Sequence, residues 1–256
     1  MSEKMFCNQC QETAGGKGCT VKGVCGKEPL IANRQDDLIY MTEILSTVTT
    51  QCRTQGIGVE PDLDHIITRN LFMTITNVNF DLKALNRAFN ETNKAADELH
   101  KMLGAPLPPE YPAPRASIDP DVRSLRELIL YGLKGLAAYL YHANQLGYEL
   151  PPADAFIQST LAKLIDEFEV DVEKLTALAL ETGKCGVEVM ALLDKANTKT
   201  FGDPEITTVQ LGVKNRPGIL ISGHDFNDLK QLLDQTEGAG VDVYTHGEML
   251  PAHYYP

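Results

Sequence analysis

The sequence predicts a mainly helical protein with a cysteine-rich loop at its start and the beginning of an α/β domain at its end. Four cysteines crowd into residues 7–25, apolar residues recur with a helical period over most of residues 36–196, and short apolar runs typical of strands follow from residue 203. A proline-rich segment separates two sets of roughly three helices, which predicts two three-helix bundles. The predicted parts are the cysteine loop (1–30), a first helical bundle (31–104), a linker (105–120), a second helical bundle (121–200) and the start of an α/β domain (201–256).

The composition is that of a globular protein and excludes several classes of partner. Of the 256 residues, 43% are hydrophobic and 23% are charged, a balance that allows a sizeable core. The net charge of −12 and the absence of Trp argue against a surface for nucleic acid or anionic lipid. No apolar run approaches the ~20 residues of a membrane span, and the first residues do not have the pattern of an export signal. We therefore expect a cytoplasmic protein that binds neither nucleic acid nor a membrane.

The four clustered cysteines are the strongest chemical signal. Cys7, Cys10, Cys19 and Cys25 have the spacing C-x2-C-x8-C-x5-C, and glycines surround them. Without an export signal, such cysteines indicate metal ligands more readily than disulfides. Glycine allows the positive φ angles that a loop around a metal centre needs. The loop therefore predicts a site with four thiolate ligands.

Two metal centres take four thiolates, and the spacing alone leaves both open. Zinc ribbons usually combine two Cys-x-x-Cys pairs, whereas this loop has one pair and two single cysteines, which favours an iron–sulfur cluster over structural zinc. The two remaining cysteines, Cys52 and Cys185, are isolated in helical segments. We expect each to be an inert thiol near the core.

Apolar periodicity and capping residues predict the helices before the linker. Aspartates at 36 and 37 precede the first pattern, and Asp62 and Asp81 cap the next two, of which the last ends at Gly104. Five prolines between residues 106 and 114 then exclude a helix. These signals predict three helices followed by a linker.

The second set of helices is predicted in the same way. Its first helix begins at Asp119-Pro120 and stops at Gly147, the next begins at Asp154, the third runs from Asp171 to Gly183, and a short one covers 187–196. Three histidines lie singly on predicted helices, and we expect them to be surface or structural residues: His65, His100 and His142.

After residue 203 the pattern predicts strands. Residues 207–211 alternate like a strand, and Gly218–Ser222 is a short apolar run typical of a buried strand. A helix over 225–237 and a strand over 241–244 follow, so that the two later strands form a β-α-β unit of Rossmann-like type and are parallel. A parallel sheet needs both faces buried, and two or three strands with one helix do not achieve this. We therefore expect the chain to be part of a longer protein.

Two side chains follow these parallel strands. His224 comes two residues after the first strand, and Glu248 comes four residues after the second. Ligands gather beyond the carboxyl ends of parallel strands, so an imidazole and a carboxylate there can bind one metal. The alternative is that His224 and Asp225 only cap the following helix.

The motifs resemble those of the hybrid cluster protein (prismane protein) family, the hydroxylamine reductases. The opening M-F-C-N-Q-C-Q-E-T at 5–13 carries the resemblance, which extends over essentially the whole chain but over only about the first half of a family member. The other matching segments are 18–23, 25–27, 121–128, 191–194, 202–207, 218–225 and 241–252.

The resemblance implies two clusters and a reaction. The four N-terminal cysteines would hold a [4Fe–4S] cluster, and His224 and Glu248 match the first two ligands of a hybrid [4Fe–2O–2S] cluster. In the family, a redox donor protein supplies electrons through the first cluster to the second, where hydroxylamine is reduced to ammonia and water. His246, two residues before Glu248, is a candidate for proton supply close to the cluster.

The resemblance also implies that this chain is incomplete as a reductase. The family's further hybrid-cluster ligands, namely cysteines, a second glutamate and a lysine, come from beyond the length of this chain, and Cys52 and Cys185 do not match them. We therefore expect a chain of these 256 residues to be inactive alone. Two alternatives are an electron-transfer module that uses only the cysteine loop and a non-enzymatic helical protein stabilised by zinc.

Overall fold

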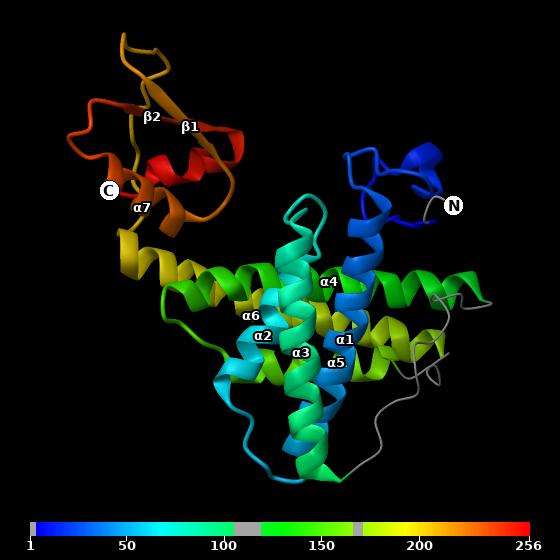
Figure 1. Cartoon of the computed structure of the whole chain (residues 1–256). Coiled ribbons are helices and arrows are strands. Elements are labelled where there is room, and N and C mark those ends of the chain that lie inside the picture. Colours follow the sequence, from blue (N-terminus) through cyan, green and yellow to red (C-terminus); the bar gives the residue numbers. More distant parts are fainter. Residues whose placement is uncertain (1–3, 105–118, 166–170) are drawn as a thin grey trace. The chain divides into compact units, whose positions relative to one another are not determined.

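The computed structural model describes residues 4–104, 119–165 and 171–256 (Figure 1). It confirms a mainly helical fold with a small parallel sheet of two strands near the C-terminal end. The chain divides into two compact units, the first with Met1–Tyr141 and Leu150–Val189, the second with His142–Glu149 and Met190–Pro256. None of the helices in the described ranges is long and apolar enough to cross a membrane.

Six long helices account for most of the chain. Proline or aspartate stands at the start of each, because proline fits the first helical turn and aspartate accepts its free N–H groups. The sequence signals at Asp81 and Gly104 are confirmed, since the Asp81 side chain accepts from the Lys83 N–H and Gly104 has a left-handed φ of 61°. The helices are α1 (Pro29–Thr54), α2 (Pro61–Met73), α3 (Leu82–Leu103), α4 (Pro120–Gln145), α5 (Pro151–Ile165) and α6 (Val172–Phe201).

Several predicted helix boundaries are wrong. Helix α1 begins at Pro29 rather than after Asp37, because its first turns bury the polar Gln35 beside Ile31 and so lack an apolar periodicity. Helices α2 and α5 likewise begin before Asp62 and Asp154, which lie in their first turns.

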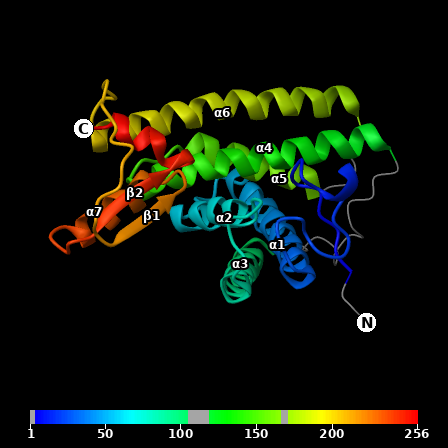
Figure 2. The same cartoon turned by 90° about the horizontal axis from the view of Figure 1, so that it is seen from above.

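Helix α6 replaces the two separate helices predicted over 171–196. Gly183 was expected to end a helix, yet it lies inside α6, as does Gly186. A Cβ atom on Gly186 would lie 3.4 Å from Leu136 of α4, so the absence of a side chain there allows close packing of α4 and α6, which run side by side in Figure 2.

The core of the first unit forms around α1. This helix packs against both α3 and α5, so helices from before and after residues 105–118 share one core. Leu38 of α1 and Leu85 of α3 are completely buried and belong to one apolar cluster. The bounds of the two predicted bundles stay a prediction, and most of the predicted linker lies outside the described residues.

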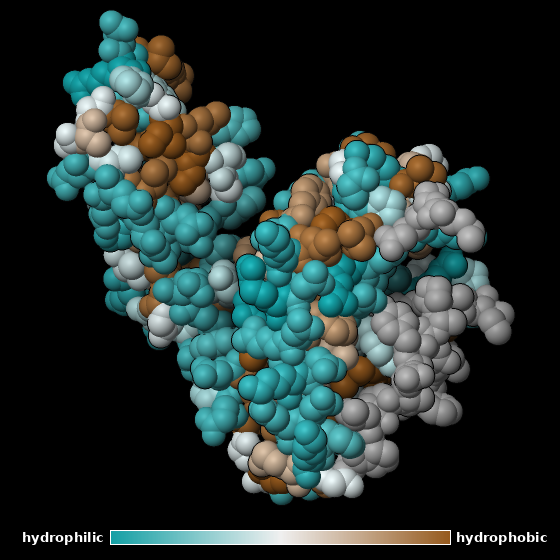
Figure 3. Space-filling view, viewed as in Figure 1, coloured by the Kyte–Doolittle hydropathy of each residue, from teal (hydrophilic) through white to brown (hydrophobic). Residues whose placement is uncertain are grey.

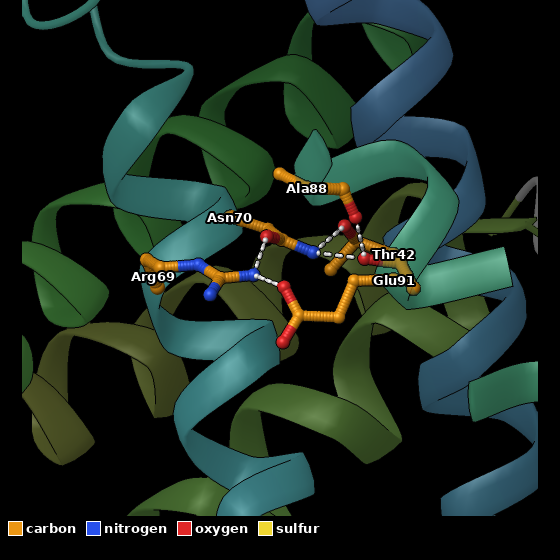
Figure 4. A network of polar contacts seen from close by, with 6 residues as sticks. Thr42, Arg69, Asn70, Ala88 and Glu91 are labelled. Atoms are coloured by element: carbon orange, nitrogen blue, oxygen red, sulfur yellow. Dashed lines mark hydrogen bonds and ion pairs between the residues drawn. The ribbon is translucent and has the colours of Figure 1, made fainter. Parts of the chain in front are cut away.

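A buried polar network joins α1, α2 and α3 (Figure 4). The Asn70 amide of α2 donates to Thr42 Oγ1 at 3.2 Å and to Thr92 Oγ1 at 2.7 Å. Arg69 donates to Glu91 of α3 at 2.8 Å, toward the outside of the network. Because buried polar groups need partners, these bonds fix the relative register of the three helices.

The second unit contains the β-α-β motif. Strands β1 (Gly218–Ser222) and β2 (Asp242–His246) are parallel, with Ser222 opposite His246, and helix α7 (Phe226–Thr236) connects them. This confirms the predicted motif, although β2 extends two residues beyond the prediction. A short helix, η2 (Gly247–Tyr254), follows β2.

The strand predicted over 207–211 is wrong. Those residues adopt no strand conformation, and Leu211 is almost fully exposed. Alternation alone does not make a strand, because a strand also needs a neighbour to accept its hydrogen bonds.

Candidate metal centres

The cysteine loop is closed by its own backbone. Cys7 and Cys19 form an antiparallel bridge, with N–H···O distances of 3.0 and 2.8 Å between their main chains. The hydroxyl of Thr13 donates to the Cys7 carbonyl at 3.0 Å, which ties the turn of the loop to its stem. The bridge therefore brings two of the four predicted ligands side by side.

The environment of Cys19 favours a thiolate. Its sulfur accepts a hydrogen bond from the Ala14 N–H at 3.4 Å and lies 3.8 Å from Thr13 Oγ1. The backbone N–H groups of Ala14 and Val24, with the charge of Lys27, outweigh burial and hold the pKa of Cys19 below its ordinary value. A thiolate is the form that binds iron or zinc.

Two glycines allow the loop its shape. Gly18 has a φ of +149°, and a Cβ atom there would lie 2.4 Å from the Phe6 ring. At Gly23, a Cβ atom would lie 3.0 Å from Cys25 Sγ. Glycine is therefore required where the chain passes close to the ring and the sulfur.

The four sulfurs differ in exposure and do not meet in a metal-binding arrangement. Cys19 is buried, Cys7 and Cys10 are half-buried, and Cys25 is exposed. Within residues 4–104, 119–165 and 171–256, no three His, Cys, Asp or Glu side chains converge as the ligands of a metal ion do. The assignment of all four cysteines to one cluster stays a prediction.

The pair predicted at the sheet edge does come together. His224 lies two residues beyond β1 and Glu248 two residues beyond β2, so the parallel register brings them to the same edge. His224 Nε2 lies 2.8 Å from Glu248 Oε2, and both side chains are about two-thirds exposed, at 68% and 67%. The pair therefore presents one nitrogen and one carboxylate to the surroundings of the sheet edge.

The residue next to His224 is a structural one. Asp225 caps α7 through the N–H groups of Asn227 and Asp228, and its Oδ2 lies 3.3 Å from His142 Nδ1. Burial raises the pKa of Asp225, but the hydrogen bond and charge of His142 and the two N–H groups outweigh it and hold the pKa below its ordinary value. Asp225, and not His224, therefore caps the helix, which leaves the His224 ring to face Glu248.

Two further histidines lie near this edge. His246 Nδ1 is 3.2 Å from Ser222 Oγ, across the last register pair of the sheet. His253 of η2, which sequence reasoning did not identify, has its Nε2 2.6 Å from Thr245 Oγ1. It lies seven residues after the end of β2, and the sequence offers no pattern that would single it out.

The isolated cysteines are buried. Burial raises the pKa of the Cys52 thiol, and burial with the charges of Glu188 and Asp154 raises the pKa of Cys185 to about 11. Both thiols are therefore protonated at neutral pH and are poor ligands and nucleophiles.

Residues 5–256 match the model of the Prismane/CO dehydrogenase family. The chain belongs to this family. It is 52% identical over 98% of its length to a hydroxylamine reductase of Clostridium perfringens, and 52% identical over its whole length to one of Desulfovibrio desulfuricans. A hydroxylamine reductase of Clostridium botulinum is 46% identical over 98% of the chain. The chain spans about half the length of these relatives.

Membership of the prismane family implies iron–sulfur chemistry, and the donor atoms of the cysteine loop are of the kind that this chemistry needs. Its four thiols are free, and the N–H groups directed at Cys19 are of the kind that stabilise cluster sulfur. The contact of His224 with Glu248 offers harder ligands of a different type. The two places therefore offer two different kinds of donor atom.

Proposed function

We propose that this chain forms the electron-receiving N-terminal part of a hydroxylamine reductase. Cys7, Cys10, Cys19 and Cys25 would hold a [4Fe–4S] cluster, and His224 with Glu248 would supply two ligands of a hybrid [4Fe–2O–2S] cluster. The observation that carries the proposal is the 2.8 Å contact of His224 with Glu248 at the carboxyl ends of paired strands. The identity to hydroxylamine reductases, 52% over nearly the whole chain, supports it.

The reaction balances as NH2OH + 2 e⁻ + 2 H⁺ → NH3 + H2O. A redox donor protein would supply the electrons, and the hybrid cluster, when bound, would supply an iron at which a small N–O compound is reduced. The chain's own residues would hold iron through the His224 ring and the Glu248 carboxylate. His246 would hold a proton near this edge, with its ring oriented by Ser222 at 3.2 Å.

The ligands also bear on the compartment of the protein and on the activity of this chain alone. Free thiols persist in a reducing compartment, so we place the protein in the cytoplasm. Two ligands do not hold a cluster of four irons, and the chain spans about half the length of its relatives. A chain of these 256 residues, produced alone, would therefore not reduce hydroxylamine.

The first test is the iron, zinc and acid-labile sulfide content of the anaerobically purified chain. The proposal requires about four irons with matching sulfide, and it requires their loss from a Cys19→Ala variant. The Cys52→Ala variant is the matched control, because Cys52 is a buried cysteine outside the loop. Zinc without sulfide would contradict the proposal and favour a structural zinc protein.

A second candidate function is electron transfer without catalysis. It is favoured by the bridge between Cys7 and Cys19, which closes the loop within the first unit alone. Hydroxylamine turnover by the 256-residue chain would exclude this alternative, and it would also contradict the inactivity expected of the chain alone. Reversible reduction without turnover is compatible with both, and the same assay on the full-length protein then distinguishes them.

A further inference from the structure

A buried lysine lies beside the cysteine loop. Only 2% of Lys27 is exposed, two residues after the last cysteine of the loop. Its ammonium donates to Gln35 Oε1 of α1 at 2.6 Å, and Gln35 is 1% exposed. The Gln35 amide in turn donates to the Asn79 carbonyl at 3.0 Å, which orients its oxygen toward the lysine. The ammonium is thus held in one place by a neutral partner.

No carboxylate of the described residues forms an ion pair with Lys27. A buried charge is costly unless an opposite charge or a set of hydrogen bonds compensates it. An anion close to this ammonium would therefore be stabilising. The cysteine loop supplies one if its thiols ionise on binding iron.

The stem of Lys27 lies beside Cys25. Its carbonyl accepts from the Gly23 N–H at 2.8 Å, and a Cβ atom on Gly23 would lie 3.0 Å from both Cys25 Sγ and Lys27 Cβ. The thiol and the lysine stem therefore flank the same glycine. The charge of Lys27 also contributes to the low pKa of Cys19 on the other strand of the loop.

The surface of the loop also carries apolar side chains. Phe6, Val21 and Val24 are exposed apolar side chains, at 57%, 79% and 62%. Apolar surface lies over this part of the first unit in Figure 3.

We propose that Lys27 is a positioning residue whose fixed positive charge raises the reduction potential of the cluster held by Cys7, Cys10, Cys19 and Cys25. This inference rests on the proposed function. Reduction adds one electron to a [4Fe–4S]²⁺ cluster to give [4Fe–4S]⁺, with no proton required. The added negative charge interacts favourably with the ammonium, so reduction by a one-electron donor becomes easier.

The test is a potentiometric titration of the 256-residue chain, with dithionite as reductant and the electron paramagnetic resonance of the reduced cluster as readout. Lys27→Gln removes the charge and keeps a polar side chain, and Lys27→Arg keeps the charge. Gln35→Glu leaves the lysine in place and neutralises it with a carboxylate. We expect Lys27→Gln and Gln35→Glu each to lower the equilibrium constant of cluster reduction at least tenfold, which is a fall of about 59 mV in the reduction potential. The potential of Lys27→Arg should stay closer to that of the wild type.

The outcomes separate this inference from the proposed function. A wild-type chain without iron and sulfide overturns both. A loaded cluster whose potential is the same in all variants overturns only the role of Lys27. If Lys27→Gln fails to assemble a cluster, the potential of Gln35→Glu decides. If Lys27→Gln and Gln35→Glu both lose the cluster while Lys27→Arg keeps it, the charge is needed for cluster assembly. That result would overturn the proposed effect on the reduction potential.

Discussion

His224 and Glu248 lie 24 residues apart in sequence, yet His224 Nε2 is 2.8 Å from Glu248 Oε2. Each follows its strand by two residues, and the parallel register of β1 and β2 pairs Ser222 with His246 just before them. Residues at equal distances beyond paired parallel strands leave the sheet at the same end, where their side chains can come into contact. The contact is therefore a consequence of register, and it does not depend on burial.

The first prediction concerns the energetic role of this pair. Exposed ion pairs contribute at most about 1 kcal/mol, so Glu248→Ala should lower the free energy of unfolding of the second unit by less than that. Asp225→Ala is the contrasting variant. It removes a helix cap with two N–H bonds and should cost about 1 kcal/mol or more. The measurement is urea unfolding followed by circular dichroism, and a larger cost for Glu248→Ala than for Asp225→Ala would make the pair structural.

The second prediction concerns which cysteines hold the cluster. Cys10→Ala and Cys25→Ala should each remove most of the iron and sulfide, although neither sulfur is buried. Cys185→Ala should retain both, since its thiol is buried and protonated. Iron and sulfide are measured on anaerobically purified protein, with circular dichroism as a check of folding. A Cys25→Ala variant with undiminished iron and sulfide would show that the exposed cysteine is not a ligand.

The sequence predicts the site at the sheet edge better than it predicts the long helices. The contact of His224 with Glu248 is expected from a parallel β-α-β unit, which brings its carboxyl ends together, whereas their role as cluster ligands comes from the family resemblance. Helix α6 could not be predicted as one helix, because Gly183 and Gly186 are common helix-ending residues, and only the fold shows that Gly186 packs against Leu136 of α4. The strand at 207–211 failed for the opposite reason, since its alternation has no strand to pair with.

Buried polar residues are the second feature that the sequence pattern does not predict. Gln and Lys are residue types that usually lie at the surface, and only the fold shows that Gln35 and Lys27 are almost fully buried. Residues that violate the polar-outside pattern concentrate at sites with a function, and these two lie beside the cysteine loop. A sequence pattern based on apolar period therefore misses this buried charge beside the cysteine loop.

The third prediction tests the continuity of α6. Gly183 is exposed, has helical backbone angles, and a Cβ atom there would meet no atom within 4 Å. Gly183→Ala should therefore stabilise the first unit by about 0.5–1 kcal/mol, because alanine loses less backbone entropy than glycine in a helix. At Gly132 of α4, a Cβ atom would lie 3.0 Å from the Thr182 methyl group, so Gly132→Ala should gain less or be destabilising. If Gly183 ended a helix with a positive φ, the alanine variant would instead be less stable than the wild type.

The fourth prediction concerns alkaline pH. Burial, with the charges of Glu188 and Asp154, raises the pKa of Cys185 from its ordinary value of 9.0 to about 11. Between these values the unfolded chain loses the thiol proton while the folded chain keeps it, so stability falls as the pH rises from 9 to 11. Cys185→Ala should lose stability less steeply over this range in urea unfolding.

In the metal-free folded wild type, iodoacetamide should modify the exposed Cys25 first and reach Cys185 only near pH 11. Modification of Cys185 at pH 8 as fast as that of Cys25 would contradict the prediction, because it would require an accessible thiolate inside the α5–α6 region.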